Sequence, residues 1–159
     1  MAITCHTPFP ERSPQYAAVI SVANTCRAIP ERCRVIAGGV TKSGSPPSKP
    51  EYKPHWTWRV KGQVAAAVAR ATSPYLVAKV RQAQLAIRLQ ERMRMGAEEG
   101  DYGQERLTPQ ELGLRQDLFD AMHALNWRGT TRIPDRLLSA RRRVLPESPS
   151  TAADTPAVV

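Results

Sequence analysis

The sequence lacks the long apolar segments and the short motifs by which many membrane proteins, secreted proteins and enzymes are recognised. None of its 159 residues lies in a run of 18 apolar residues, so no membrane-spanning helix is predicted. Residues Met1–Pro10 show no basic start followed by an apolar core, so no secretory signal is predicted. A glycine-rich phosphate loop, an H-E-x-x-H zinc motif and a nucleophile turn of the G-x-S-x-G type are all absent, so the enzyme classes that use them are not indicated.

Cysteine is also scarce. The chain has 3 cysteines, an odd number, and no C-x-x-C spacing. Cys26 and Cys33 lie seven positions apart, which suits one face of a helix better than a zinc site or a disulfide framework. We therefore expect all the cysteines to be reduced and structural, which fits a reducing, cytoplasmic compartment.

Acidic residues are rare in the first part of the chain. Residues 1–95 hold 15 basic and 4 acidic residues, residues 96–120 hold 2 and 7, and residues 121–145 hold 6 and 1. The formal net charge is +9. A compact domain with this excess favours a polyanionic partner, and nucleic acid is the usual one. A merely solvated basic surface, or an arginine-rich bias of the genome, would explain the same composition.

Periodicity and turn residues predict four strands and several helices. Strands are expected at Ile3–Phe9, Tyr16–Ala23, Val40–Lys42 and His55–Val60, and helices from Asn24 or Thr25 to Ala37, at Gly62–Ala71, at Ser73–Arg94 and from Pro109 onward. Pro30 removes a backbone hydrogen bond inside the first helix, so that helix either begins at Pro30 or is kinked. This order predicts an α+β fold, with helices on one face of a small antiparallel four-stranded sheet and further helices at the C-terminal end.

The longest predicted helix, Ser73–Arg94, has an apolar side and a basic side. Its apolar stripe has helical spacing and consists of Leu76, Val80, Ala83 and Ile87, widened by Leu85 and Leu89. Lys79 is expected to face inward among these apolar residues. Arg81, Arg88 and Arg92 share a second face. Further on, Thr108-Pro109-Gln110-Glu111 is a capping box with proline at the first helical position.

The predicted strand His55–Val60 alternates strictly between two kinds of residue. If the face with Trp56 and Trp58 belongs to the core, Thr57 and Arg59 point outward. A twisted ribbon with such side chains can enter the major groove of DNA and read base edges. Every half-exposed antiparallel sheet has a polar outer face, however, so the pattern alone also fits a sheet without a nucleic-acid partner.

Three segments resemble the single-motif LAGLIDADG homing endonuclease family, over roughly residues 3–142. S-V-A-N-T (Ser21–Thr25) with the later G-G-V is similar to the family's second strand, middle helix and glycine turn. W-T-W-R-V-K-G (Trp56–Gly62) is similar to its fourth strand. The most specific match is P-Y-L-x-x-K-x-x-Q-A-x-L (Pro74–Leu85), followed in the correct order by A-L-N (Ala124–Asn126).

The resemblance implies roles for a few residues. Lys79 falls on the family's active-site lysine, which would stabilise charge or position water at the scissile phosphate; the alternative is an ordinary helix lysine. Asn24 falls where the family places a polar group near the nucleophilic water, or it simply caps a helix. Contacts to double-stranded DNA are implied for Thr57, Arg59 and Arg81, and the arginine-rich end would add Arg128 and Arg132.

One part of the family pattern is not found. The name-giving helix, with the acidic residue that holds Mg²⁺, precedes the family's first strand, whereas that strand is already expected at Ile3 here. Mg²⁺ is thus implied by the resemblance, but no metal ligand is identified. We expect residues 1–95 to form a truncated αβ domain, 96–145 a C-terminal helical extension and 146–159 a disordered tail. A homodimer is possible but doubtful without that helix, which supplies the family's two-fold interface.

Three function classes remain open from the sequence. The first is a metal-dependent endonuclease that makes site-specific double-strand breaks, with this chain truncated and deficient in cleavage. The second is a non-catalytic DNA-binding module or regulator that uses the same basic sheet. The third is an RNA-binding protein with a maturase-like role. A start codon assigned too late, a gene fragment or a genuinely shortened protein would each explain the missing helix.

Overall fold

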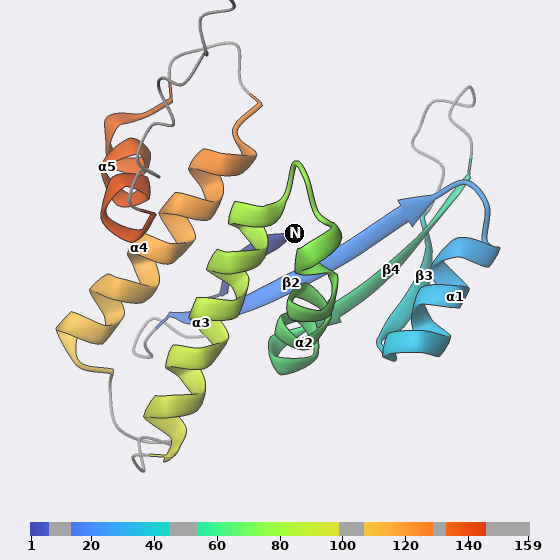
Figure 1. Cartoon of the computed structure of the whole chain (residues 1–159), viewed down its shortest axis with the longest axis horizontal. Coiled ribbons are helices and arrows are strands. Elements are labelled where there is room, and N and C mark those ends of the chain that lie inside the picture. Colours follow the sequence, from blue (N-terminus) through green and yellow to red (C-terminus); the bar gives the residue numbers. More distant parts are fainter. Residues whose placement is uncertain (7–13, 45–53, 99–106, 129–132, 146–159) are drawn as a thin grey trace, which may run out of the picture.

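The computed structural model describes residues 1–6, 14–44, 54–98, 107–128 and 133–145 (Figure 1). The elements are β1 (Ala2–His6), β2 (Gln15–Asn24), α1 (Ala28–Ala37), β3 (Val40–Gly44), β4 (His55–Lys61), α2 (Gly62–Thr72), the short 3-10 helix η1 (Ser73–Tyr75), α3 (Val80–Glu98), α4 (Pro109–Asn126) and α5 (Asp135–Val144). The predicted tail 146–159 and most of the predicted loop 43–54 lie outside the described residues. The α+β class predicted from the sequence is confirmed.

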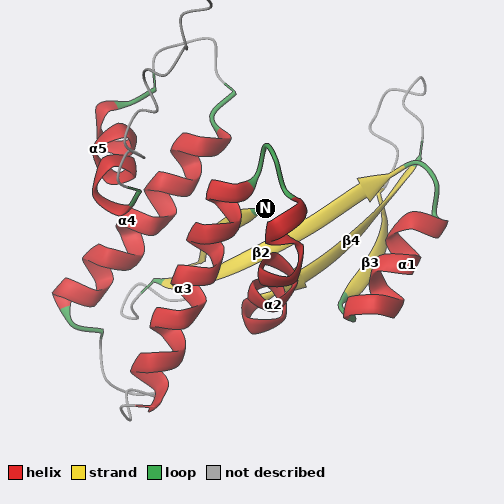
Figure 2. Ribbon diagram, viewed as in Figure 1, coloured by secondary structure: helices red, strands yellow, loops and turns green. Residues whose placement is uncertain are grey.

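The four strands form one antiparallel sheet in the order β1-β2-β4-β3. β2 is the longest strand and pairs with β1 along its first half and with β4 along its second half. Figure 2 shows α2 and α3 crossing in front of the strands, with α4 beside them and α1 at the far end of the sheet. The helices thus cover one face, as expected for a sheet that buries only one of its sides.

The core lies between that face and the helices. Alternate residues of β2 and β4 point into it, including Ile20, Trp58 and Val60, each at most 6% exposed. They join a single cluster with Ala65 and Ala69 of α2 and buried residues of α3 and α4. The face of β4 with Trp58 and Val60 therefore belongs to the core, which is the condition under which Thr57 and Arg59 point outward. The indole Nε1 of Trp58 also donates a hydrogen bond of 2.7 Å to the Gly38 carbonyl.

Helix α1 differs from both sequence-based alternatives. It begins at Ala28, neither at Asn24 or Thr25 nor at Pro30. Pro30 is the third helical residue, where a backbone N–H has no partner within the helix, so the proline is accommodated without a kink. Asn24 is the last residue of β2 and does not cap α1. Its Oδ1 accepts a hydrogen bond of 2.8 Å from the Cys26 N–H, which stabilises the turn out of the strand.

The predicted helix from Ser73 is also wrong at its start. α2 ends at Thr72, η1 contains Pro74, and the chain is extended at Leu76. The first helical hydrogen bond of α3 runs from the Ala83 N–H to the Lys79 carbonyl, at 3.0 Å. Lys79 therefore immediately precedes α3 rather than lying inside a helix. The other end of α3 extends past Arg94 to Glu98.

Ion pairs attach the C-terminal helices to the rest of the fold. Thr108 caps α4 as predicted, because its Oγ1 accepts from the Glu111 N–H at 3.2 Å. The Glu111 carboxylate binds Arg92 of α3, at 2.8 Å, so α4 is tied to α3. Arg143 of α5 pairs with Asp117 of α4 at 2.5 Å. Arg136 also pairs with Asp120 of α4, at 3.4 Å, so two arginines of this end are occupied by contacts within the molecule.

Candidate nucleic-acid interface

The face of the sheet away from the helices carries a row of cations. Arg59 and Lys61 of β4 lie at alternating positions and point to this outer face. Lys42 of β3 lies opposite Thr57, so its side chain shares the same face. Arg59, Lys61 and Lys42 are exposed and Thr57 is half-buried. We call Lys42, Arg59 and Lys61 the sheet cations.

The sheet cations have no carboxylate to neutralise them. None of their side chains forms a hydrogen bond or ion pair with another described residue, and no described acidic residue occupies an outward position of the four strands. Several arginines elsewhere in the described chain are paired with a carboxylate, as in Arg34 with Glu31 and Arg70 with Glu91. Unpaired like charges on one surface raise the local potential and attract a polyanion.

A hollow of about 720 Å³ lies beside the sheet cations. It opens where β4 continues past the end of β3, since Arg59 pairs with Val40 and Lys61 has no partner on that side. Its lining consists of Ala37, Gly38, Gly39, Val40, Lys42, Thr57, Arg59, Val60, Lys61 and Val64. The lining of the hollow thus combines apolar residues with three cations, and no described acidic residue belongs to it.

Lys79 lies in a second polar cluster, where the starts of β1 and α3 meet the end of α4. Its Nζ donates to Asn126 Oδ1 at 3.3 Å, and Asn126 Nδ2 donates to the Met1 carbonyl at 3.1 Å. Gln82 Nε2 donates to the Leu125 carbonyl at 3.4 Å. Burial, together with the positive charge of Lys79, lowers the pKa of the Met1 α-amino group.

The structure does not bring Asn24 and Lys79 into contact. Ala2, at the start of β1, lies opposite Val19. Asn24 is five positions further along β2, about 16 Å away at the rise of a strand. Its side chain also makes the turn contact with Cys26. An active-site role for Asn24 stays a prediction.

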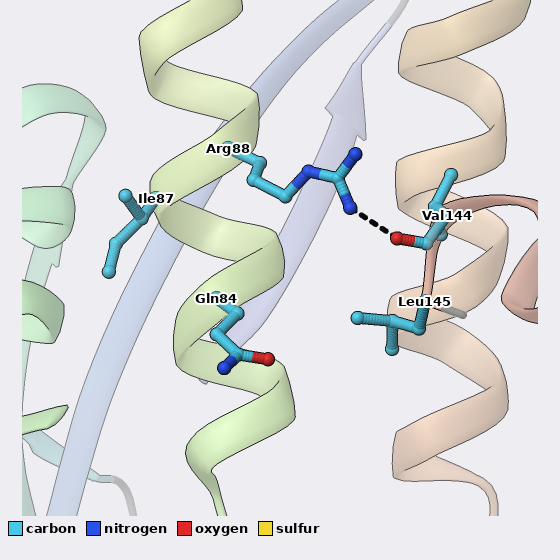
Figure 3. A pocket seen from close by; sticks show the side chains of 5 residues that line it. All are labelled: Gln84, Ile87, Arg88, Val144 and Leu145. Atoms are coloured by element: carbon cyan, nitrogen blue, oxygen red, sulfur yellow. Dashed lines mark hydrogen bonds between the residues drawn. The ribbon is translucent and has the colours of Figure 1, made fainter. Parts of the chain in front are cut away.

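The other residues predicted to contact DNA, Arg81, Arg128 and Arg132, lie outside the sheet. Arg81 is exposed two residues after Lys79, and Arg128 is exposed two residues after Asn126. Neither side chain has a hydrogen bond or ion pair with a described residue. Arg132 lies outside the described residues. Of the predicted basic face of α3, Arg92 pairs with Glu111 and Arg88 donates to the Val144 carbonyl (Figure 3).

The contact of Arg88 borders a smaller hollow between α3 and the end of α5. Figure 3 shows it lined by Gln84, Ile87, Arg88, Val144 and Leu145, and its volume is about 370 Å³. Arg88 is the only ionisable group in this lining, and its guanidinium already binds a carbonyl. The lining therefore has no group free to carry out chemistry.

The described residues do not fit a divalent metal. No three of their histidine, cysteine, aspartate or glutamate side chains approach one another closely enough to hold an ion. The oxygens around Lys79 belong to an amide and to backbone carbonyls, whereas Mg²⁺ is usually bound through carboxylates. None of the described helices combines the length and apolar character needed to cross a bilayer.

Sequence reasoning missed three residues of these surfaces. Asn126 was noted only as part of A-L-N, and its contact with Lys79 joins residues 47 positions apart. Lys61 follows the alternation of Thr57 and Arg59, so extending the predicted strand by one residue would have found it. Lys42 depends on the register between β3 and β4, which the sequence does not reveal.

The four-stranded antiparallel sheet with helices on one face matches the fold of a solved homing endonuclease. The structure is similar to the crystal structure of the homing endonuclease I-CvuI in complex with the I-CreI target in the presence of 2 mM Mg, in which the DNA is not cleaved. The TM-score is 0.59 at 16% sequence identity, over 89% of this chain and 83% of that chain. No family model and no curated protein sequence matches the chain.

Proposed function

We propose that this protein binds double-stranded DNA through the outer face of its sheet. The observation that carries the proposal is the row of sheet cations, Lys42, Arg59 and Lys61, exposed and without a partner among the described residues. A twisted antiparallel ribbon fits the major groove, and lysine and arginine side chains neutralise phosphates. The similar fold of I-CvuI, solved in complex with DNA, supports the choice of duplex DNA.

The salt dependence of binding measures how many phosphates the protein contacts. Each contact contributes about 0.9 to the slope of log K against log salt, so the three sheet cations predict a magnitude of at least about 2.7. Anisotropy of a fluorescein-labelled duplex over a series of salt concentrations gives this slope. A wild-type protein with no measurable duplex binding at low salt would contradict the proposal.

A matched pair of variants separates the sheet from general charge. Arg59→Ala with Lys61→Ala removes two sheet cations, whereas Arg32→Ala with Arg142→Ala removes two exposed arginines from α1 and α5. We expect the first pair to lower the slope by about 1.8 and the second to leave it almost unchanged. Equal losses for the two pairs would mean that net charge alone attracts the DNA.

We further propose that the 159-residue chain binds DNA without cutting it. The contacts of Lys79 are with neutral groups, and no acidic cluster among the described residues would hold the metal ions that activate water. Incubation of a supercoiled plasmid carrying candidate target sites with Mg²⁺ tests this. Site-specific nicking by the wild type that disappears in Lys79→Ala would refute it.

Competition with RNA distinguishes the proposed partner from the maturase-like alternative. A-form RNA has a deep, narrow major groove that a protein ribbon does not enter, so the sheet should prefer B-form DNA. We expect an unlabelled duplex DNA to displace the labelled duplex at lower concentration than a structured RNA of equal charge. The reverse order would favour RNA as the partner.

A further inference from the structure

Asn126 both donates a hydrogen bond and accepts one through its side chain. It is the last residue of α4, and its amide bridges the Met1 carbonyl and the Lys79 ammonium, at 3.1 and 3.3 Å. A carbonyl can only accept a hydrogen bond, so the NH₂ group must face Met1 and the oxygen is left for Lys79. The two neighbours therefore allow only one of the two orientations of the Asn126 amide.

Lys79 has no other hydrogen-bond partner for its ammonium among the described residues. It precedes α3, and lysine carries its charge on a long, flexible stem. The end of α4 also suits a cation, because the C-terminal end of a helix carries partial negative charge. Asn126 thus holds the ammonium beside the end of α4, where the Lys79 side chain is half-buried.

Two exposed arginines lie close to this pair in the chain. Arg81 follows Lys79 by two residues, Arg128 follows Asn126 by two residues, and neither side chain has a described partner. Lys79, Arg81 and Arg128 are thus three cations separate in the chain from the sheet cations. The neutral amide of Asn126 can hold Lys79 without neutralising it, whereas a carboxylate would cancel its charge.

We propose that Asn126 is a positioning residue that directs the Lys79 ammonium to a phosphate of the bound duplex. This inference rests on the proposed DNA binding. Asn126 itself does not contact the DNA; it acts through Lys79. A purely structural role is the alternative, because the contact with Met1 also ties β1 to α4.

Salt dependence tells these two roles apart. Lys79→Ala should lower the slope of log K against log salt by about 0.9, the value for one phosphate. If Asn126 acts through Lys79, Asn126→Ala should lower the slope by nearly as much, although it removes no charge. The double variant should show no further loss, because the two residues act as one unit.

Gln82→Ala is the matched control. Gln82 also joins α3 to the end of α4 through a neutral amide, but its hydrogen bond is to the Leu125 carbonyl, whereas Lys79 binds Asn126. We expect this variant to lower the stability while leaving the salt slope of DNA binding unchanged. If Asn126→Ala behaves in the same way as Gln82→Ala, the role of Asn126 is structural and the inference is overturned.

Asn126→Asp provides a second variant should Asn126→Ala fail to fold. The carboxylate would form an ion pair with Lys79 and hold its charge away from the phosphate, so the slope should again fall by about 0.9. A wild-type slope in Asn126→Asp would overturn the inference. If the wild type binds duplex DNA and the Asn126 variants keep its salt slope, the proposed function stands and the inference fails. If the wild type does not bind duplex DNA, both fail.

Discussion

Substituting Gly39 tests how the glycine turn places β3 and its lysine beside β4. Gly38 and Gly39 both have positive φ, 68° and 87°, a region that costs an alanine about 1–3 kcal/mol. A Cβ on Gly39 would lie 2.5 Å from Val60 Cγ1 and 2.6 Å from the Arg59 carbonyl oxygen. A Cβ on Gly38 would meet nothing within 4 Å.

The two substitutions therefore differ by a steric clash. Gly38→Ala should lower the free energy of unfolding by the backbone strain alone, about 1–3 kcal/mol. Gly39→Ala adds overpacking against a backbone atom, typically about 1–3 kcal/mol more. Because the clash is with Arg59 and Val60, β3 must move away from β4, and we expect DNA binding to weaken through displacement of Lys42.

Urea unfolding followed by circular dichroism gives the free energy of unfolding of both variants. The slope of this free energy against urea concentration checks that unfolding remains two-state. Anisotropy of the labelled duplex, under conditions where each variant is fully folded, measures binding. Equal destabilisation by the two substitutions would refute the steric reasoning. Normal DNA affinity in folded Gly39→Ala would show that the position of β3 does not matter for binding.

The remaining predictions concern the core and its pH dependence. Burial and the Cys5 thiol raise the pKa of Tyr16 to about 12 from 10.0, so the folded state keeps a proton that the unfolded chain loses; the free energy of unfolding should fall between about pH 10 and pH 12. Urea unfolding across this range should show a smaller fall in Tyr16→Phe, and an equal fall would contradict the assignment. Leu89→Ala should destabilise by about 2–5 kcal/mol, since Leu89 is 0% exposed. Val77→Ala, at 96% exposure, should change stability by less than about 0.5 kcal/mol, and similar effects of the two would place Leu89 outside the core.

Local patterns predicted the fold because its elements obey simple periodicities. β4 alternates strictly, so its core face was identified from Trp56 and Trp58 alone. The start of α3 was missed for a related reason: Leu76 continues the apolar spacing of the helix, although the chain there is extended. The spacing of apolar residues indicates which side chains are buried, but not whether the backbone that carries them is helical or extended.

The candidate site could be predicted only in part. Arg59 followed from alternation, and Lys79 followed from a resemblance over a short motif. Their partners did not follow, because the contact of Lys79 with Asn126 spans 47 positions and the placement of Lys42 requires the register of two strands separated by a long connection. Contacts of this kind arise from tertiary packing, which no local pattern encodes.

The division between paired and unpaired charge gives the molecule a preferred direction of approach. An ion pair such as Arg143 with Asp117 is a short dipole, and its field fades over a few ångströms. The sheet cations are isolated charges, which act over about 8–10 Å at physiological salt. In the field of a polyanion the three sheet cations therefore contribute a torque that turns the strands toward it before contact, in addition to the pull on the unpaired arginines elsewhere. Orientation during diffusion raises the rate of productive encounters, so we expect salt to slow association more than it speeds dissociation.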